Sequence, residues 1–562
     1  MKIHLNCPAR HISLTIFGAI ICFASFAQGF SPQVQAKLQR VIDSIQNYAD
    51  TPYVGGIAAA INVDGLALWK GATGYAARNI DEQNNLLPGG TPFTTDTLSR
   101  IYSITKSFTA ALVLELANDG AFSLNDPVIK YVPSITSINP GLNPYVTIHQ
   151  LVAHESGYSD YVDELNLQIA VASDPNRVWT TYDMLAFVHQ IAPPGSERRY
   201  ASTNYSLLGA IIEVATGKKV EELFRQRFFN KLGLNSMYLA IRESIDDRGS
   251  LASPHDNISA FNPIFQATGQ PTFPDTFTNI SRFPMTAIAS LAFTNGGIVS
   301  NVADVAKWGN DLFGGRATSK AILDTMLHSI SPYPDEDGDY LGYGITYNKQ
   351  ISETDSFIGH NGNAVGYKSI MFYQLDRKMT IAVLTNFHGA NEYGIGRALY
   401  NALPNFLCGS KDNRVKVCFK GYTLCLPRAA ARFIINRGAY LGGCGGKMIQ
   451  NTDSLLTAIL SPSELASMGI QKPDNGRNEL TVTPNPINKS ALFTFKVSQP
   501  GYADLRVYDM AGKQVLLLFN GSMDKGEVRQ VHFNASNLSS GVYIARLQTT
   551  TGIIEKKLVL KP

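Results

Sequence analysis

The chain has 562 residues, with 48 Lys and Arg against 45 Asp and Glu and a formal net charge of +3 at pH 7. This length exceeds one compact domain, so we expect two or three domains with ample core. Because charge is nearly balanced and no basic run is interleaved with aromatic residues, the composition argues against nucleic-acid binding.

Residues 1–27 are predicted to form a secretory signal peptide. Lys2 and Arg10 precede the apolar run Ile12 to Phe26, and the small residue Ala27 suits cleavage. A membrane anchor is the alternative, but a run of roughly 15 apolar residues is short for a span of about 20. We therefore expect export, and no transmembrane segment in the mature chain.

An α+β domain is predicted at residues 31–405. An amphipathic helix and two strands open it, joined by the hairpin dipeptide Asp64-Gly65, at Pro32 to Tyr48, Gly56 to Val63 and Leu66 to Gly71. The pattern is mainly helical from Thr97 to about Leu312. It contains a long polar connection, Ser253 to Pro284, that we expect to shape the pocket.

Two more strands and a helix follow, at Lys368 to Tyr373, Met379 to Thr385 and Tyr393 to Leu403. Strands near both ends of the domain with helices between them predict an antiparallel sheet closed by the two chain ends. Helices flank this sheet, and a helical subdomain is inserted.

The most informative motif is Ser103 to Lys106, which starts an apolar helix that stops at Asn118-Asp119-Gly120. Residues at i and i+3 share a helix face, so the lysine amine can reach the serine hydroxyl. A serine becomes a nucleophile when a base takes its proton, and a lysine can be that base once its pKa is lowered. The pattern alone is weak, because Ser522 to Lys525 also fits; that copy lies between glycines and is predicted to be a surface turn.

Two further clusters support Ser103. Tyr200 to Tyr205 carries hydroxyl and amide side chains into a helix that begins near Leu207, and His360-Asn361-Gly362 precedes the later strand pair. Nucleophile, base, tyrosine and a histidine-bearing sheet edge together suit an acyl-transfer site. Each of these residues taken singly also fits a packing role.

Four cysteines lie in a Cys-rich segment, residues 407–447: Cys408, Cys418, Cys425 and Cys444. In an exported chain an even number of cysteines predicts disulfides, with three possible pairings. A zinc site is the alternative, but the segment has no histidine and no Cys-x2-Cys pair. We expect no metal and no organic cofactor.

A polar linker is predicted at residues 448–478, and an all-β sandwich at residues 480–562. The short strands that predict the sandwich are Leu492 to Val497, Ala503 to Asp509, Gln514 to Phe519, Val528 to Asn534, Gly541 to Gln548 and Ile553 to Leu560.

With these motifs in order, Ile57 to Asn386 resembles the serine β-lactamase and penicillin-binding-protein superfamily, in its class C-like branch. Further matching stretches are Leu151 to Gly157, Asn295 to Ser300 with Asp304, and Gly359 to Gly362 with Gly366-Tyr367. This branch includes D-alanyl-D-alanine carboxypeptidases, D-amino-acid peptidases, esterases and class C β-lactamases. The resemblance implies a β-lactamase/transpeptidase-like fold.

The resemblance also implies roles for single residues. Ser103 would be the acylated nucleophile, Lys106 its activating partner and Tyr200 the proton carrier to the leaving group. The backbone amides of Ser103 and Asn363 would form the oxyanion hole. The substrate-binding positions that it implies are Ser202, His360, Gly362 and Asn363.

This chain departs from the family pattern in two places. His360 stands where β-lactamases usually carry a lysine, which favours peptidase or esterase activity over β-lactam hydrolysis. Ser202 stands where the family's Tyr-x-Asn has its asparagine, and Asn204 should lie on another face. His154 resembles a structural histidine, and Lys368 either meets a substrate carboxylate or is a solvated strand lysine.

The C-terminal region resembles the type A sorting domain of the type IX secretion system, through Pro484-Asn485-Pro486, Leu505 to Asp509 with Gly512, Leu538 with Gly541-Val542-Tyr543, and Lys556 to Leu560. An accessory carbohydrate- or surface-binding sandwich is the alternative. The resemblance implies that the type IX machinery is a partner and that the protein is extracellular or at the cell surface.

The sequence therefore predicts a secreted serine hydrolase that forms an acyl-enzyme on Ser103 and acts on ester or D-amino-acid peptide-like amide bonds. The alternatives are a D-alanyl-D-alanine carboxypeptidase, a β-lactamase, or a catalytically inactive surface binding protein on the same fold.

Overall fold

The computed structural model describes residues 29–47, 53–245, 247–335, 338–409, 413–444, 448–449, 478–536 and 538–561. The predicted signal peptide and most of the predicted linker lie outside these residues. The chain divides into two compact units, Met1–Gln450 and Asn451–Pro562, which are described separately.

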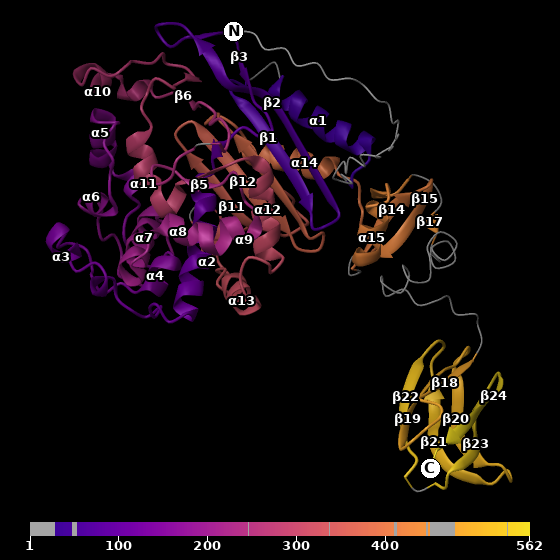
Figure 1. The fold of residues 1–562 in the computed structure, drawn as a ribbon. Coiled ribbons are helices and arrows are strands. Elements are labelled where there is room, and N and C mark those ends of the chain that lie inside the picture. Colours follow the sequence, from indigo (N-terminus) through magenta and orange to yellow (C-terminus); the bar gives the residue numbers. More distant parts are fainter. Residues whose placement is uncertain are drawn as a thin grey trace, which may run out of the picture. The chain divides into compact units, whose positions relative to one another are not determined.

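An eight-stranded antiparallel sheet organises the first unit (Figure 1). In spatial order its strands are β3 (Leu86–Pro92), β2 (Ala67–Ile80), β1 (Gly56–Val63), β13 (Met379–Thr385), β12 (Tyr367–Gln374), β11 (Phe357–Ala364), β10 (Thr346–Asn348) and β9 (Tyr340–Leu341). Strand β1 pairs with β13 along its length, from Ile57 opposite Thr385 to Val63 opposite Met379. The predicted closure of the sheet by the two chain ends is confirmed.

The first hairpin forms at Asp64-Gly65, where Gly65 has φ +64°, a conformation that glycine adopts without steric cost. Strand β2 is longer than predicted, because it continues past Gly71 to pair with β3. Its later residues are half-buried and do not alternate, so their pattern does not predict a strand.

Helices cover both faces of the sheet. The backbone of α14 (Glu392–Ala402) approaches Ile370, whereas α12 (Val302–Phe313) approaches Met371. Because successive strand residues point to opposite faces, these helices lie on opposite sides. Helix α1 (Pro32–Gln46) packs with α14, on β2 (Figure 1).

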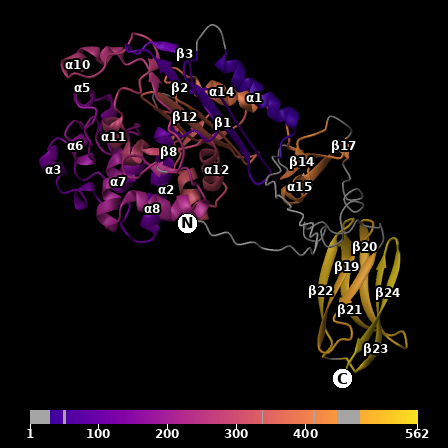
Figure 2. The same ribbon diagram turned by 45° about the horizontal axis from the view of Figure 1, so that its top comes forward.

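The helical subdomain gathers around α2 (Thr105–Asn118), α7 (Ser202–Thr216) and α11 (Thr286–Gly296), which pack on one another (Figure 2). The other helices of this unit outside the Cys-rich segment are α3 (Ile135–Ile138), α4 (Ile148–Val152), α5 (Leu165–Ser173), α6 (Thr181–Leu185), α8 (Val220–Phe224), α9 (Asn230–Leu232), α10 (Asn262–Ala267) and α13 (Lys320–His328). Two small sheets join β4 (Ser99–Arg100), β8 (Ile298–Ser300) and β5 (Tyr238–Leu239), and β6 (His255–Asp256) with β7 (Thr278–Asn279).

Helix α2 lies at the centre of the core, where it is buried on nearly every side. Its Phe108 stacks on Trp308 of α12, with ring centroids 3.7 Å apart and planes 12° apart. This packing fixes the helix start, and with it the predicted serine and lysine.

The Cys-rich segment forms a four-stranded sheet and one helix, in the order β16 (Tyr440–Leu441), β14 (Arg414–Phe419), β15 (Tyr422–Pro427) and β17 (Met448–Ile449), with α15 (Arg428–Ile435). Of the three possible pairings, the structure has Cys408–Cys425 and Cys418–Cys444. Residues 448–449, predicted as the start of the linker, form a parallel strand beside β15.

The second unit is a sandwich of two sheets, as predicted. One sheet has the order β18 (Glu479–Thr483), β19 (Ser490–Lys496) and β22 (Val528–Asn534); the other has β21 (Gln514–Met523), β20 (Gly501–Asp509), β23 (Gly541–Thr549) and β24 (Gly552–Leu560). Both sheets contribute to one apolar core. Ser522 lies in strand β21, which ends at Met523, so no helical turn links it to Lys525.

Candidate active site

Ser103 lies in a short 3-10 turn, Tyr102–Ile104, that leads directly into α2. The turn is tied to the sheet, because Ser369 of β12 donates a hydrogen bond from Oγ to the Ile101 carbonyl at 2.9 Å. Tyr102 has φ +41°, which is strained for a residue with a side chain. Strain of this kind persists where surrounding packing imposes it, and here it sets the position of the next residue, Ser103.

Lys106 is fully buried and touches Ser103. Its Nζ lies 2.9 Å from Ser103 Oγ, 3.0 Å from the Asn295 carbonyl oxygen and 3.4 Å from Ser202 Oγ. Burial lowers the pKa of the Lys106 amine to about 7, against the opposing effect of the Asp160 carboxylate. The amine is therefore substantially neutral near pH 7.

Tyr200 completes a three-residue contact. Its hydroxyl donates to Ser103 Oγ at 2.7 Å, and Lys106 Nζ lies 4.7 Å from its ring centroid. Burial raises the pKa of the Tyr200 phenol, so the hydroxyl keeps its proton. His154 stacks on the Tyr200 ring at 4.7 Å, and its Nδ1 accepts a hydrogen bond from the Ala201 amide at 3.1 Å. His154 thus holds the tyrosine in place.

His360 precedes the predicted strand pair, which forms β12 and β13, and it lies inside a further strand, β11, that begins at Phe357 and was not predicted. Its Nδ1–H donates to the Asn361 carbonyl at 2.6 Å, and its ring centroid is 6.0 Å from that of Tyr200. Burial, with a smaller effect of the Lys106 charge, lowers the pKa of His360 to about 3. The imidazole is therefore neutral at neutral pH.

Gly362 allows β11 to approach the segment before Ser103. A Cβ atom at this position would lie 2.2 Å from the Ile101 carbonyl oxygen and 2.5 Å from Ser369 Oγ. Gly362 therefore lines neither of the cavities beside Ser103. Asn363, the next residue, lines both of them.

Two groups in the site received no role from the sequence. Asp160 accepts hydrogen bonds from the backbone amides of Ser202, at 2.9 Å, and Val162, at 3.2 Å, and burial raises its pKa. Asn295 belongs to the stretch Asn295 to Ser300 that resembles the family. It contacts Lys106 through its backbone carbonyl, a contact that any residue type could make. The signal for Asp160 was its place three residues after the Leu151 to Gly157 stretch.

Ser202 begins α7, and its Oγ faces Lys106 as described. Asn204 lies elsewhere, as predicted: it is fully buried, and its Oδ1 accepts a hydrogen bond from Ser156 Oγ at 2.6 Å. Lys368 contacts the Ala390 carbonyl at 3.0 Å and the Glu392 carboxylate at 3.5 Å, and it lines neither cavity.

Two cavities meet at Ser103. The first, of about 570 Å³, is here called the apolar cavity, and its walls include Ile258, Phe261, Phe265, Phe283, Ile288 and Val365. Most of these residues come from the connection Ser253 to Pro284, which confirms that this segment shapes the pocket. The second, of about 530 Å³, is here called the polar cavity, and its walls include Glu197, Arg198, Arg199, Asp335, Asp339 and His360.

Residues 41–405 match the beta-lactamase family over more than half of the chain. The chain belongs to the beta-lactamase family. It is thus a member of a family of serine hydrolases with the fold that the sequence predicted. Residues 481–561 match the secretion system C-terminal sorting domain family, which supports export or cell-surface location.

Curated relatives match only part of this beta-lactamase-family chain. Penicillin-binding protein 4 of Amycolatopsis lactamdurans is 29% identical over 200 residues, which cover 36% of this chain and 49% of the relative. The D-alanyl-D-alanine-carboxypeptidase/endopeptidase AmpH of Escherichia coli (strain K12) is 26% identical over 231 residues, covering 39% and 55%. The chain thus spans about half the length of these relatives.

Among solved structures, the D-amino acid amidase from Ochrobactrum anthropi SV3, complexed with D-phenylalanine, aligns with a TM-score of 0.53 at 22% identity. The alignment covers 66% of this chain and 99% of the amidase. This similarity shows a shared fold.

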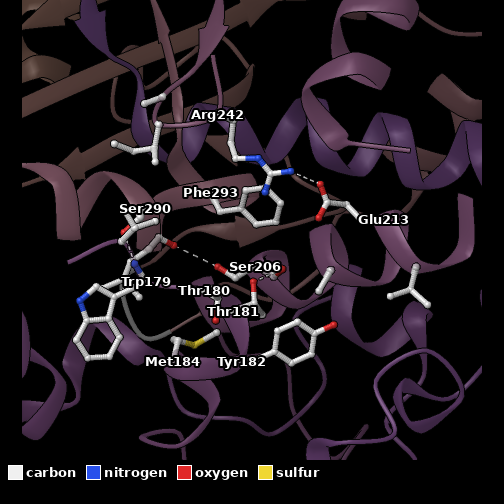
Figure 3. Close-up of a pocket in the computed structure, with 16 residues that line it drawn as sticks. Trp179, Thr180, Thr181, Tyr182, Met184, Ser206, Glu213, Arg242, Ser290 and Phe293 are labelled. Atoms are coloured by element: carbon white, nitrogen blue, oxygen red, sulfur yellow. Dashed lines mark hydrogen bonds and ion pairs between the residues drawn. The ribbon is translucent and has the colours of Figure 1, made fainter. Parts of the chain in front are cut away.

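A third pocket of this beta-lactamase-family chain, about 340 Å³, lies between α6, α7 and α11, and Ser103 does not line it (Figure 3). Its charged residues, Arg242 and Glu213, form an ion pair with each other (Figure 3). Its wall residue Ser206 accepts a hydrogen bond from Asn295 Nδ2 at 2.6 Å. The pocket therefore borders Asn295, which contacts Lys106, and does not reach Ser103.

Within the described ranges, His, Cys, Asp and Glu side chains form no group suited to holding a metal ion. The same ranges contain no helix with the length and apolar character needed to cross a membrane.

Proposed function

We propose that this protein is an acyl-enzyme serine hydrolase in which Ser103 is the nucleophile, Lys106 the base and Tyr200 the proton carrier. One observation carries the proposal: Ser103 Oγ contacts both Lys106 Nζ and the Tyr200 hydroxyl, at 2.9 and 2.7 Å, where two cavities meet. A nucleophile, a base and a proton donor within hydrogen-bond reach are what acyl transfer requires.

The three contacts of Lys106 suit a base. A neutral amine has two N–H groups and one lone pair. The Asn295 carbonyl can only accept, and Ser202 Oγ can accept as well, so these two oxygens take both N–H groups. The lone pair is then left for the Ser103 O–H, from which it removes the proton.

The proposed cycle has two steps, acylation of Ser103 and hydrolysis of the acyl-enzyme. Ser103 Oγ attacks the substrate carbonyl carbon while its proton passes to Lys106, and that proton then travels through the Tyr200 hydroxyl to the leaving nitrogen or oxygen. The bond to the leaving group breaks and an acyl-enzyme ester remains. Water attacks this ester, gives a proton back through the same groups, and releases the acid and free Ser103.

The oxyanion hole is proposed at the backbone amides of Ser103 and Asn363, with Ser202 and His360 beside the substrate. Loss of one oxyanion donor typically costs about 10²–10³ in rate. Gly362 has a positioning role in this scheme, because it lets β11 come close enough to Ile101 for Asn363 to face Ser103.

The proposed substrates are esters and amides, including D-amino-acid derivatives. The family membership, the carboxypeptidase/endopeptidase relative and the fold shared with a D-amino acid amidase support this choice. A D-alanyl-D-alanine carboxypeptidase and a β-lactamase are the alternatives within the family.

The test is a panel of esters, D- and L-amino acid amides, D-alanyl-D-alanine peptides and a chromogenic cephalosporin. We expect turnover of esters or D-amides that Ser103→Ala abolishes. Turnover of the cephalosporin above all others would identify a β-lactamase instead. No turnover of any substrate would support an inactive binding protein.

We further propose that the protein leaves the cell by signal-peptide export followed by type IX secretion through residues 481–561, supported by the family match of that region. A hydrolase outside the outer membrane does not meet its own cell wall, which disfavours a housekeeping carboxypeptidase. Cell fractionation tests this; enzyme confined to the periplasm would reverse the conclusion.

A further inference from the structure

The walls around Ser103 are rich in carboxylates. The apolar cavity is lined by Asp160 and Asp163 and by no lysine or arginine, and its one histidine, His388, contacts Asp256 at 3.0 Å. The polar cavity is lined by five carboxylates and two arginines: Asp160, Asp163, Glu197, Asp335, Asp339, Arg198 and Arg199. Both cavities therefore carry a net negative formal charge.

One of the two arginines already has several partners. Arg198 contacts the Glu155 carboxylate at 2.7 Å and donates from Nη1 to the Ser329 carbonyl at 2.7 Å and the Leu341 carbonyl at 2.9 Å. A substrate carboxylate next to the scissile bond would lie among carboxylates and compete with Glu155 for this guanidinium. Such a substrate is poorly matched to the site.

Asp160 stands at the boundary of the two cavities and lines both of them together with Ser103. Each of its oxygens accepts one backbone N–H, Oδ2 from Ser202 and Oδ1 from Val162, and no lysine, arginine or histidine of the described residues pairs with it. A carboxylate offers about four lone-pair sites, so each oxygen can accept one more hydrogen bond. The two amides hold this acceptor in a fixed orientation beside the nucleophile.

We propose that Asp160 binds the free ammonium group of an aminoacyl substrate, whose large apolar side chain fills the apolar cavity among Phe261, Phe265 and Phe283. This inference rests on the proposed function and names its substrate class: esters and amides of an apolar amino acid whose amino group is unblocked. The same charges select against penicillins and against peptides with a terminal carboxylate at the scissile bond.

The position of Asp160 next to Ser103 suits a substrate ammonium and disfavours a substrate carboxylate. The α-amino nitrogen of an aminoacyl group is two bonds from the carbonyl carbon that Ser103 attacks, so its binding group must lie in the wall next to Ser103. Asp160 meets this condition, and the titratable groups around it are Lys106, Tyr161, Asp163 and Tyr200. Lys106 is the cation among them, and it must be neutral to act as the base.

The first test uses wild-type protein and matched substrates: the 4-nitrophenyl ester of D-phenylalanine, its N-acetyl derivative and the 3-phenylpropionyl ester, which lacks the amine. We expect kcat/KM for the free amine to exceed that for the amine-free ester by about 10-fold or more, the size of one charge-assisted hydrogen bond. This preference should disappear above the pKa of the substrate amine, about 8. Equal rates, or a preference that is independent of pH, would overturn the inference.

The second test is Asp160→Asn, with Asp163→Asn as the matched control for loss of one charge in the same cavities. Asp160→Asn should lower kcat/KM for the D-phenylalanine ester about 10-fold more than for the 3-phenylpropionyl ester, whereas Asp163→Asn should change this ratio less. Because the amine-free ester also needs Lys106, the ratio is insensitive to a change in the Lys106 pKa. Equal losses on both esters would assign Asp160 a merely structural role.

The third test is acylation of Ser103 by benzylpenicillin and by its methyl ester. We expect the methyl ester to react about 10-fold faster, since it lacks the carboxylate; faster reaction of the free acid would contradict the inference. Hydrolysis of the 3-phenylpropionyl ester without amine preference would refute only this inference. No Ser103-dependent hydrolysis of any ester would refute the proposed function itself.

Discussion

At the scale of single residues, the proposed hydrolysis depends on a buried amine. Lys106 has no exposed surface, and burial lowers its pKa to about 7. His154 and His360 lie nearby, but burial lowers the pKa of both below their ordinary value. Among these three basic groups, Lys106 is therefore the one that changes charge near neutral pH.

This gives a pH dependence with a defined sign. The base must be neutral, so kcat/KM should fall tenfold per pH unit below about 7 and reach a plateau above it. A pH profile with a substrate that does not titrate, such as the 3-phenylpropionyl ester, measures this. A rate that is constant between about pH 5 and 9 would contradict the role of Lys106.

The Tyr200 hydroxyl offers a second prediction at this scale. Tyr200→Phe should lower kcat by about 10²-fold or more, because proton transfer to the leaving group loses its carrier. Tyr205→Phe is the matched control, since the Tyr205 hydroxyl is also buried but donates to the Val152 carbonyl at 3.0 Å. The control should lose about 1 kcal/mol of stability and keep its rate. Equal rate losses in both variants would contradict the assignment.

At the scale of elements, the site depends on how closely α7 and α11 pack. A Cβ atom on Gly209 of α7 would lie 2.3 Å from Thr294 Oγ1 and 2.5 Å from the Phe293 ring. Thr294 immediately precedes Asn295, whose carbonyl contacts Lys106. The small residue in α7 therefore sets the distance on which the lysine contact depends.

Gly209→Ala tests this packing. Helix propensity alone would make the alanine variant about 1 kcal/mol more stable. Because the added Cβ collides with α11, we instead expect a loss of about 1–3 kcal/mol in unfolding free energy together with a lower kcat. Gly396→Ala in α14 is the control, because the added Cβ would meet the end of the flexible Ile370 side chain. A stabilised and fully active Gly209→Ala protein would contradict the prediction.

Patterns local to one element were predictable. Ser103 and Lys106 are three residues apart, so sequence alone indicates their contact. The role of Asp160 is not visible in this way, because the Ser202 amide that donates to it lies on another element, far along the chain. The contact of Asn295 with Lys106 uses a backbone carbonyl, which every residue type has, so the sequence does not indicate it. Strand β11 around His360 was not predicted, because a short polar run with glycines hides its start.

At the scale of the whole molecule, the two units have separate apolar cores. The residues that form the candidate site all lie in the first unit. The second unit matches a sorting domain, and none of its described residues lines the two cavities at Ser103.

A chain that ends at residue 450 should therefore keep kcat/KM within about twofold of the full chain, because independent sites contribute additively. In the native host, the same truncation should prevent secretion. Parallel assays of the purified full and truncated chains measure the first effect, and culture fractions measure the second. A truncated chain that folds but is inactive would show that the second unit contributes to catalysis.

In the proposed mechanism Ser103 is the nucleophile and becomes covalently modified. Intact-mass spectrometry after treatment with a fluorophosphonate, followed by peptide mapping, tests it most directly. We expect a single adduct on Ser103 in the wild-type chain and none in Ser103→Ala. An unmodified Ser103, or an adduct on another residue in a preparation that hydrolyses the 3-phenylpropionyl ester, would contradict it.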